Sequence, residues 1–182
     1  MSTYSIIRSP EALQAGDHIS RPIASTFGVF THHALVVDTK DGITLIEVVS
    51  NVTSGGLGSS LAVFPFGRSC HVREHIVDLG EYMRQGVLRR YNYGECNAPF
   101  EAIQKARSLL GEFDYDQFDN NCEHFVRWCK SGRGQSDQAQ NAKGLLQVTG
   151  SILLGVLGLF SPGSVGPSQS GNGVGYTYRH KF

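Results

Sequence analysis

The feature that most constrains the fold is a pair of β-type segments joined by a tight turn. Residues 27–38 and 43–49 are rich in β-branched and apolar side chains, and the Asp41-Gly42 pair between them is typical of hairpin turns. Further short segments with β-type composition occur at residues 17–23, 61–66, 70–77 and 89–93. The first half of the chain therefore predicts a run of antiparallel strands.

Helical periodicity replaces this pattern in the second half. Residues 97–113 carry apolar side chains three and four positions apart, with Asn97 placed to cap a helix and Pro99 in its first turn. A second helix is predicted to begin at Cys122 and to stop near Gly132. Strands followed by helices predict an α+β domain, an antiparallel sheet with packed helices after it.

Composition excludes several classes of function. The chain has 182 residues, of which 40% are hydrophobic and 18% charged, which is typical of a globular domain. Its formal net charge is zero, so we expect no nucleic-acid partner. The four cysteines have no CxxC spacing and the N-terminus has no apolar core of a signal peptide, so we expect a reducing, cytosolic setting.

One cysteine has the surroundings of a nucleophile. Asp119, Asn120 and Asn121 are helix-capping residue types, and they directly precede Cys122. A cysteine in the first turn of a helix lies near unpaired backbone N–H groups and the positive end of the helix dipole, which favour the thiolate. The alternative is that Cys122 is a small buried apolar residue at a helix start.

A cysteine nucleophile needs a base and a group that orients the base. His32 and His33 are the first candidates, because they lie on a strand predicted to be central in the sheet. Neighbours on a strand face opposite sides, so only one can face the Cys122 helix, and the residues alone leave both open. Glu47, on the return strand, could accept the imidazole N–H across the hairpin, or it could be a solvent-facing strand residue.

The order of these residues, His then Glu then Cys, is the reverse of papain-type enzymes. A catalytic triad is recognised by geometry rather than by order, so a circular permutation is compatible with it. A competing pattern, His71-Val-Arg-Glu74-His75, matches one motif of zinc peptidases. That motif needs a helix, and the flanking residues here are β-type, so we expect no metal and no other cofactor.

Three motifs resemble the lecithin retinol acyltransferase-like domain family, which includes phospholipase A and acyltransferase enzymes related to the HRAS-like suppressors. Residues 121–126, Asn-Cys-Glu-His-Phe-Val, resemble the family's cysteine signature, and residues 30–37 resemble its histidine motif. Gly16-Asp17 resembles the start of the domain, and the resemblance spans roughly residues 14–160. In this register His32 matches the catalytic histidine, and Glu47 falls near a position where many members have a second histidine.

The resemblance implies a circularly permuted papain-like fold and acyl transfer through a Cys122 thioester, with His32 as base and Glu47 as the third member. The substrate would be a glycerophospholipid, and the acyl acceptor water, an amine or a lysolipid. Two rival interpretations are a non-catalytic interaction or regulatory module of the same fold, and a thiol peptidase or amidase of the wider papain-like class. The enzyme is favoured because the chain has all three residues that the chemistry needs, His32, Glu47 and Cys122.

We divide the chain into four parts. Residues 1–132 form the catalytic domain, residues 133–143 a polar linker, and residues 161–182 a Gly/Ser/Pro-rich disordered tail. Between them, residues 144–160 carry no charge and are just long enough to cross a bilayer. We expect them to insert into or lie on a membrane, although a helix packed on the domain is the alternative.

These features predict where the protein works. The apolar segment is preceded by basic residues, Lys130, Arg133 and Lys143. This charge pattern favours a catalytic domain on the cytoplasmic face of a membrane, with a C-terminal helix that crosses the membrane once. The expected partners are a glycerophospholipid substrate and a membrane surface, and we expect a monomer.

Overall fold

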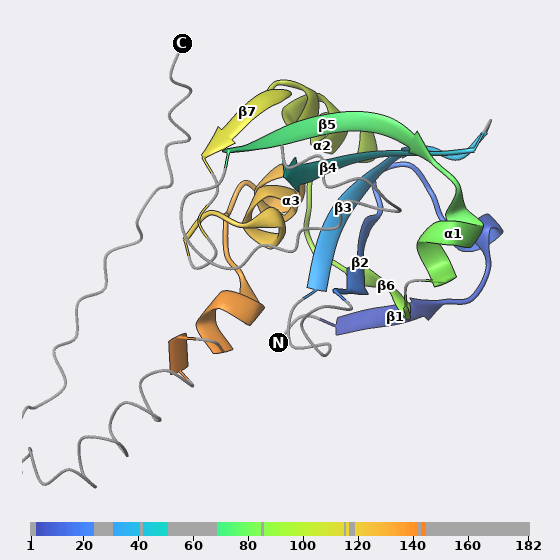
Figure 1. Cartoon of the computed structure of the whole chain (residues 1–182), viewed down its shortest axis with the longest axis horizontal. Helices are drawn as coiled ribbons and strands as arrows, with labels where there is room; N and C mark the ends of the chain where they lie inside the picture. Colours follow the sequence, from blue (N-terminus) through green and yellow to red (C-terminus); the bar gives the residue numbers. More distant parts are fainter. Residues whose placement is uncertain are drawn as a thin grey trace, which may run out of the picture.

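The computed structural model describes residues 3–23, 31–40, 42–50, 69–84, 86–114, 116, 119–141 and 143–144. In this part of the chain the fold is α+β, as predicted, and Figure 1 shows a curved antiparallel sheet with helices on either side. Its strands are β1 (Thr3–Ile7), β2 (His18–Pro22), β3 (Thr31–Asp38), β4 (Ile43–Ser50), β5 (Ser69–Val77), β6 (Leu88–Asn92) and β7 (Gly111–Asp114). Their order across the sheet is β1-β6-β2-β3-β4-β5-β7.

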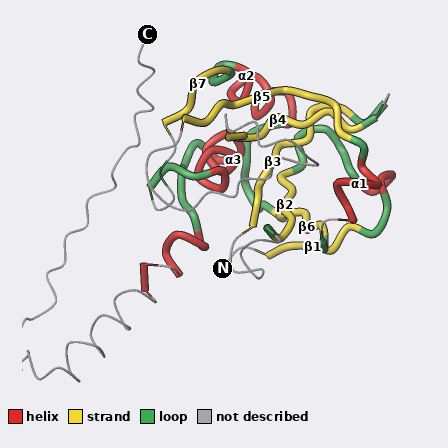
Figure 2. Tube along the Cα trace, in the orientation of Figure 1, coloured by secondary structure: helices red, strands yellow, loops and turns green. Residues whose placement is uncertain are grey.

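The helices lie on two different faces of this sheet. They are the 3₁₀ helix η1 (Pro10–Ala12) and the α-helices α1 (Leu79–Arg84), α2 (Pro99–Arg107) and α3 (Cys122–Ser131). Figure 2 shows α2 and α3 together near β3 and β4, and α1 at the opposite side of the sheet. The sheet therefore has apolar residues to bury on both faces.

Strand β3 shows how the sequence supplies both faces. Leu35 and Val37 pack in one cluster with α2 and α3, whereas Ala34 and Val36 pack in a second cluster that includes Tyr82 of α1. Successive side chains on a strand point to opposite faces, so a nearly continuous apolar run can bury both. Strand β3 is thus a central strand, as the sequence predicted.

The hairpin of β3 and β4 sets the position of Glu47. The register pairs Ala34 with Glu47 and Leu35 with Ile46, and it shifts between Val36 and Asp38. Glu47 therefore points to the same face as Ala34 and lies diagonally opposite His32. The solvent-facing alternative for Glu47 is wrong, because the residue is only 5% exposed.

The long helix predicted for residues 97–113 is wrong at both ends. Helix α2 covers Pro99–Arg107, and Gly111 adopts a positive φ of 118° that starts strand β7. Strand β7 pairs with β5, so a distant partner overrides the local helical pattern. Asn97 does not cap α2: Ala98 holds the cap position, and the Asn97 side chain donates to the carbonyl of Cys129.

The predicted apolar stripe of this helix is also only partly right. Ile103, Ala106 and Leu109 are buried against α3, but Phe100 is 72% exposed and Leu110 43% exposed. Two strands were not predicted, β1 and the short β7. The strand candidate at residues 61–66 lies outside the described residues.

The described residues contain no helix that is long and apolar enough to cross a membrane. The apolar segment 144–160 lies outside them except for Gly144. The predicted single-pass helix thus has no support from the described part of the chain.

A close backbone approach fixes the junction between β2 and α2. Gly16 has a φ of 85°, and a Cβ atom added there would lie 2.7 Å from Pro99 Cβ and 2.8 Å from Pro99 Cα. We expect Gly16→Ala to lower the free energy of unfolding by about 3 kcal/mol, through strain and overlap together. Urea unfolding measures this loss. The matched control is Gly94→Ala, because no atom lies within 4 Å of its added Cβ; equal losses in both variants would contradict the interpretation.

Candidate active site

Cys122 is the first residue of α3, and the residue before it caps the helix as predicted. The Asn121 side chain accepts hydrogen bonds from the N–H groups of Glu123 and His124, at 2.9 and 3.1 Å. In return, His124 Nδ1 accepts the N–H of Asn121 at 3.2 Å. Burial lowers the pKa of His124 to about 4, so its ring is neutral and can accept this bond. This reciprocal capping box fixes the helix start that carries the thiol.

The start of α3 lies against the start of β3. Cys122 is buried, and its Sγ is 3.9 Å from the carbonyl oxygen of Thr31. Thr31 directly precedes His32 in the sequence. The fold therefore brings the predicted nucleophile and the predicted base together, although they are 90 residues apart in the chain.

His32 is held by Glu47 inside the protein. Its Nε2 lies 2.6 Å from Glu47 Oε2, and both residues are buried. Burial alone would lower the pKa of His32, but the Glu47 carboxylate and the Cys122 side chain overcome this effect and raise the pKa to about 9. Nδ1 of His32 has no hydrogen-bond partner among the described residues at ordinary bond distances. Since Nε2 is held by Glu47, Nδ1 is the ring nitrogen of His32 that is left to receive a proton.

The two neighbouring histidines face opposite sides, as the strand predicts. His33 points to the face that α3 covers, with Leu35 and Val37, yet the Cys122 thiol acts on His32 and not on His33. Cys122 is the first residue of α3, and its Sγ lies 3.9 Å from the carbonyl oxygen of Thr31, the residue before His32.

Glu47 has a second histidine partner that the sequence interpretation missed. His75 Nε2 lies 2.8 Å from Glu47 Oε1, and the His75 side chain is 41% exposed. Burial would raise the pKa of Glu47, but His32 and His75 together hold it well below its usual range. The carboxylate is thus ionised and bonded on both oxygens. The sequence did carry a signal for this contact, because residues 70–77 have the composition of a strand. Once the register of this strand against β4 is known, it places a histidine beside Glu47.

The residues of the competing zinc motif lie on a strand. His71, Glu74 and His75 belong to β5, as the flanking residues predicted, and not to the helix that the motif requires. Glu74 forms a bidentate ion pair with Arg107, at 2.9 and 2.6 Å. Glu74 and His75 therefore bind different neighbours, Arg107 and Glu47.

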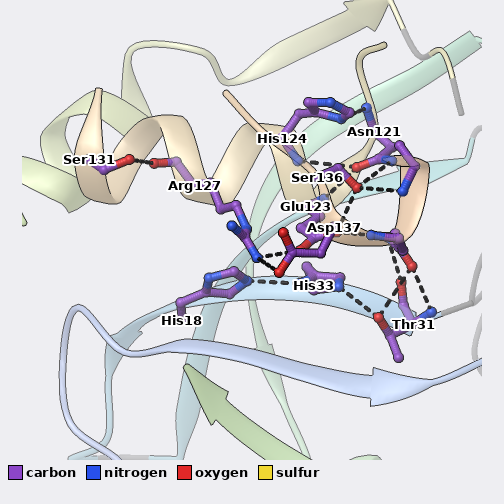
Figure 3. A network of polar contacts seen from close by, with 12 residues as sticks. His18, Thr31, His33, Asn121, Glu123, His124, Arg127, Ser131, Ser136 and Asp137 are labelled. Atoms are coloured by element: carbon purple, nitrogen blue, oxygen red, sulfur yellow. Dashed lines mark hydrogen bonds and ion pairs between the residues drawn. The ribbon is translucent and has the colours of Figure 1, made fainter. Parts of the chain in front are cut away.

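A second polar cluster ties the segment after α3 to the cysteine helix (Figure 3). The buried Glu123 carboxylate pairs with Arg127 at 2.8 Å and accepts the Ser136 hydroxyl at 2.6 Å. Arg127 also pairs with Asp137 at 2.8 Å. Residues 137–141 are helical and Ala139 is buried, so part of the segment predicted as a linker packs against the site.

The sequence is similar to a known family and to named proteins. The sequence matches the family model "Lecithin retinol acyltransferase" over residues 11–135. It is 43% identical over 63 residues to phospholipase A and acyltransferase 1 of Rattus norvegicus, covering 33% of this chain and 38% of the relative. It is 42% identical over 66 residues to lecithin retinol acyltransferase of Bos taurus, covering 34% of this chain and 29% of the relative.

The family match covers more than half of the chain, and the chain therefore belongs to the lecithin retinol acyltransferase family. This confirms the family that the sequence motifs indicated. The names of the matched relatives describe acyltransferases and phospholipases. The matches to these relatives are partial, since they cover only 29–38% of the relatives' lengths.

The buried His32–Glu47 pair predicts a particular dependence of stability on pH. The raised pKa of His32 contributes stability that is complete below pH 6.5 and is lost as the pH rises through about 9. The lowered pKa of Glu47 contributes stability that is present above pH 4.5 and is lost in acid. We expect the stability difference between wild type and Glu47→Gln to be largest near pH 5–6.5 and to shrink on both sides.

Urea unfolding at a series of pH values measures this difference. The matched control is Glu74→Gln on the neighbouring strand, which removes a carboxylate paired with Arg107 rather than with a histidine. Its stability difference should stay constant between pH 6.5 and 9, because arginine does not titrate there. A flat profile for Glu47→Gln would contradict the assignment of the ion pair to His32.

Proposed function

We propose that this protein is a thiol acyltransferase or phospholipase A that acts on glycerophospholipids. Cys122 is the nucleophile, His32 is the base, and Glu47 orients the base. The observation that carries the proposal is the buried 2.6 Å contact of His32 with Glu47 beside Cys122 at the capped start of α3. The family of the chain and the names of its relatives support the acyl-transfer chemistry.

The proposed reaction has two halves. In the first, the Cys122 proton moves to His32, the thiolate attacks the ester carbonyl carbon, and the carbon–oxygen ester bond breaks. The lysolipid oxygen takes the proton from His32, and the acyl group remains on Cys122 as a thioester. In the second half, water, an amine or a lysolipid gives its proton to His32 and attacks the thioester, and the Cys122 sulfur leaves and is reprotonated.

The raised pKa of His32 fits the first of these steps. A histidine whose pKa is about 9 holds the proton that it takes from Cys122 firmly at neutral pH, until the lysolipid oxygen receives it. Glu47 stabilises the imidazolium, since it remains ionised in the protein interior. Activity should therefore decline as the pH rises through about 9 and His32 loses its proton.

Backbone groups at the start of α3 are suited to stabilise the oxyanion. The N–H groups of Glu123 and His124 are occupied by the Asn121 cap. The N–H of Cys122 makes no hydrogen bond within the described residues, and it is the donor we assign to the oxyanion.

We also propose that the fold is a circularly permuted papain-like fold. Three features support this assignment: the sheet precedes the cysteine helix, the order is His32, Glu47 and then Cys122, and the thiol begins a helix packed on the sheet. The substrate lipid implies a membrane surface as partner. We propose that residues 144–160 hold the enzyme there, on the cytoplasmic face.

The first test is activity on mixed-chain phosphatidylcholine in detergent micelles, with lysophosphatidylcholine, free fatty acid and amine-acylated product all quantified. We expect Cys122→Ala and His32→Gln to lose activity by about 10³-fold or more, and Glu47→Gln to lose about 10–100-fold. In Glu47→Gln the alkaline decline should also move to lower pH. The matched control is Cys96→Ala, because Cys96 is an exposed cysteine away from the site and should leave activity unchanged.

The products separate the possible reactions. A ratio that favours free fatty acid indicates a hydrolase, and one that favours acylated acceptor indicates a transferase. Folded wild-type protein without activity on several lipids would contradict the proposal and would support the non-catalytic module.

A further inference from the structure

A row of buried polar groups runs from the surface to the cysteine site on the α3 side of the sheet. Tyr93 Oη is 2.6 Å from His18 Nδ1, and His18 Nε2 is 2.8 Å from His33 Nδ1. His33 Nε2 is in turn 2.7 Å from Thr31 Oγ1. Figure 3 shows His18, His33 and Thr31 following one another along the sheet. Both histidines are fully buried, and the proposed reaction does not use either of them.

Gln138 contacts Thr31, the last residue of the row, at the end nearest the cysteine. Its Oε1 is 3.1 Å from the backbone N–H of Thr31 and 3.3 Å from the Thr31 hydroxyl. Its Nε2 donates to the carbonyl of Thr31 at 3.4 Å. Because the backbone N–H of Thr31 can only donate, the amide atom that faces it must be the oxygen. The Gln138 side chain thus contacts the backbone of Thr31 on both its donor and its acceptor.

This anchor sets the direction of every hydrogen bond in the row. The Thr31 hydroxyl donates to Gln138 Oε1, so Thr31 Oγ1 must accept from His33 Nε2–H. A neutral imidazole has one N–H, so His33 Nδ1 accepts from His18 Nε2–H. By the same reasoning, His18 Nδ1 accepts from the Tyr93 hydroxyl. The reverse direction would leave two oxygen lone pairs facing each other between Thr31 and Gln138.

The electrostatics agree with two neutral rings. Burial lowers the pKa of His18 and of His33 well below the usual value, and the Arg127 charge lowers both further. Burial also raises the pKa of Tyr93, so its phenol keeps the proton that it donates. A protonated ring at either position would turn a ring nitrogen that accepts in this row into a donor.

We propose that Tyr93, His18 and His33 are positioning residues of the thiol site, an inference that rests on the proposed function. Their one-way row of hydrogen bonds holds Thr31 on Gln138 and thereby fixes the start of β3 against Cys122. Thr31 is the residue through which the row acts, because its carbonyl lies 3.9 Å from Cys122 Sγ and the next residue is His32. A shift of Thr31 would misplace the base relative to the thiol, and small misplacements are costly in catalysis.

The first test observes the protons directly. ¹⁵N NMR of the full chain with labelled histidine, assigned with His18→Gln and His33→Gln, reports the tautomer of each ring. We expect both rings to be neutral at pH 7 and protonated on Nε2. Nδ1–H tautomers, or a charged ring at either position, would overturn the proposal. The tautomers are read from the wild-type protein without any activity, and the two variants serve only to assign its signals.

The second test measures the reactivity of Cys122 toward iodoacetamide, followed by mass spectrometry of the Cys122 peptide, together with kcat/KM on phosphatidylcholine. Thr31→Val removes the hydroxyl without changing the shape, and we expect both rates to fall by about tenfold. Thr31→Ser restores a hydroxyl and should stay within about twofold of wild type. Equal rates in wild type and Thr31→Val would overturn the proposal.

The outer end of the row has its own matched pair. Tyr93→Phe removes the donor to His18 Nδ1, so we expect the ¹⁵N signal of this nitrogen to shift and Cys122 to react more slowly. Tyr91→Phe is the control, because the Tyr91 ring stacks on His18 at 4.4 Å while its hydroxyl is outside the row. Identical histidine spectra in Tyr93→Phe and wild type would contradict the row.

The outcomes separate this inference from the proposed function. If no lipid is turned over, the tautomers and the alkylation rates still decide whether the row exists and acts on Cys122. If lipid is turned over but Thr31→Val behaves as wild type, the proposed function stands and the positioning role fails.

Discussion

The buried carboxylate of Glu47 is the group on which the rest of the site depends, because a buried carboxylate must be neutralised or hydrogen-bonded. Taking a charge out of water costs several kcal/mol, unless hydrogen bonds and opposite charge offset the loss. Two histidines meet the requirement from two different strands, His32 from β3 and His75 from β5. The pairing of β4 with both neighbours is what brings them there, so the central hairpin and the site depend on the same register.

The same constraint recurs at Glu123, on the other side of the cysteine. Its buried carboxylate is bonded by Arg127 within α3 and by Ser136 after it. Satisfying this charge draws residues 134–141 back onto the domain and delivers Gln138 to Thr31. The cysteine helix is thus held at its start by its own cap, by a strand and by the segment that follows it.

How much of this the sequence predicts depends on how local each interaction is. The Asn121 cap, the antiparallel pairing of β3 with β4 and the end of α3 at Gly132, with a φ of 72°, depend on residues close in the sequence and were predicted. Strand β1 was missed because its partner β6 is far along the chain, Thr3 opposite Asn92. The predicted extension of α2 to Phe113 was wrong, because residues 111–114 form strand β7 and pair with β5. The helical spacing of apolar residues carries no information about this distant partner.

The candidate site divides in the same way. By itself, the sequence determined that Cys122 begins a capped helix, that His32 and His33 face opposite sides, and that Glu47 can reach an imidazole, because these follow from spacings of a few residues. Only the tertiary structure decided that Glu47 is buried, that it holds His75 as well, and that His33 serves His18 and Thr31 instead of the thiol. Burial and the pairing of distant groups are properties of packed strands and helices, and no single stretch of sequence contains both partners.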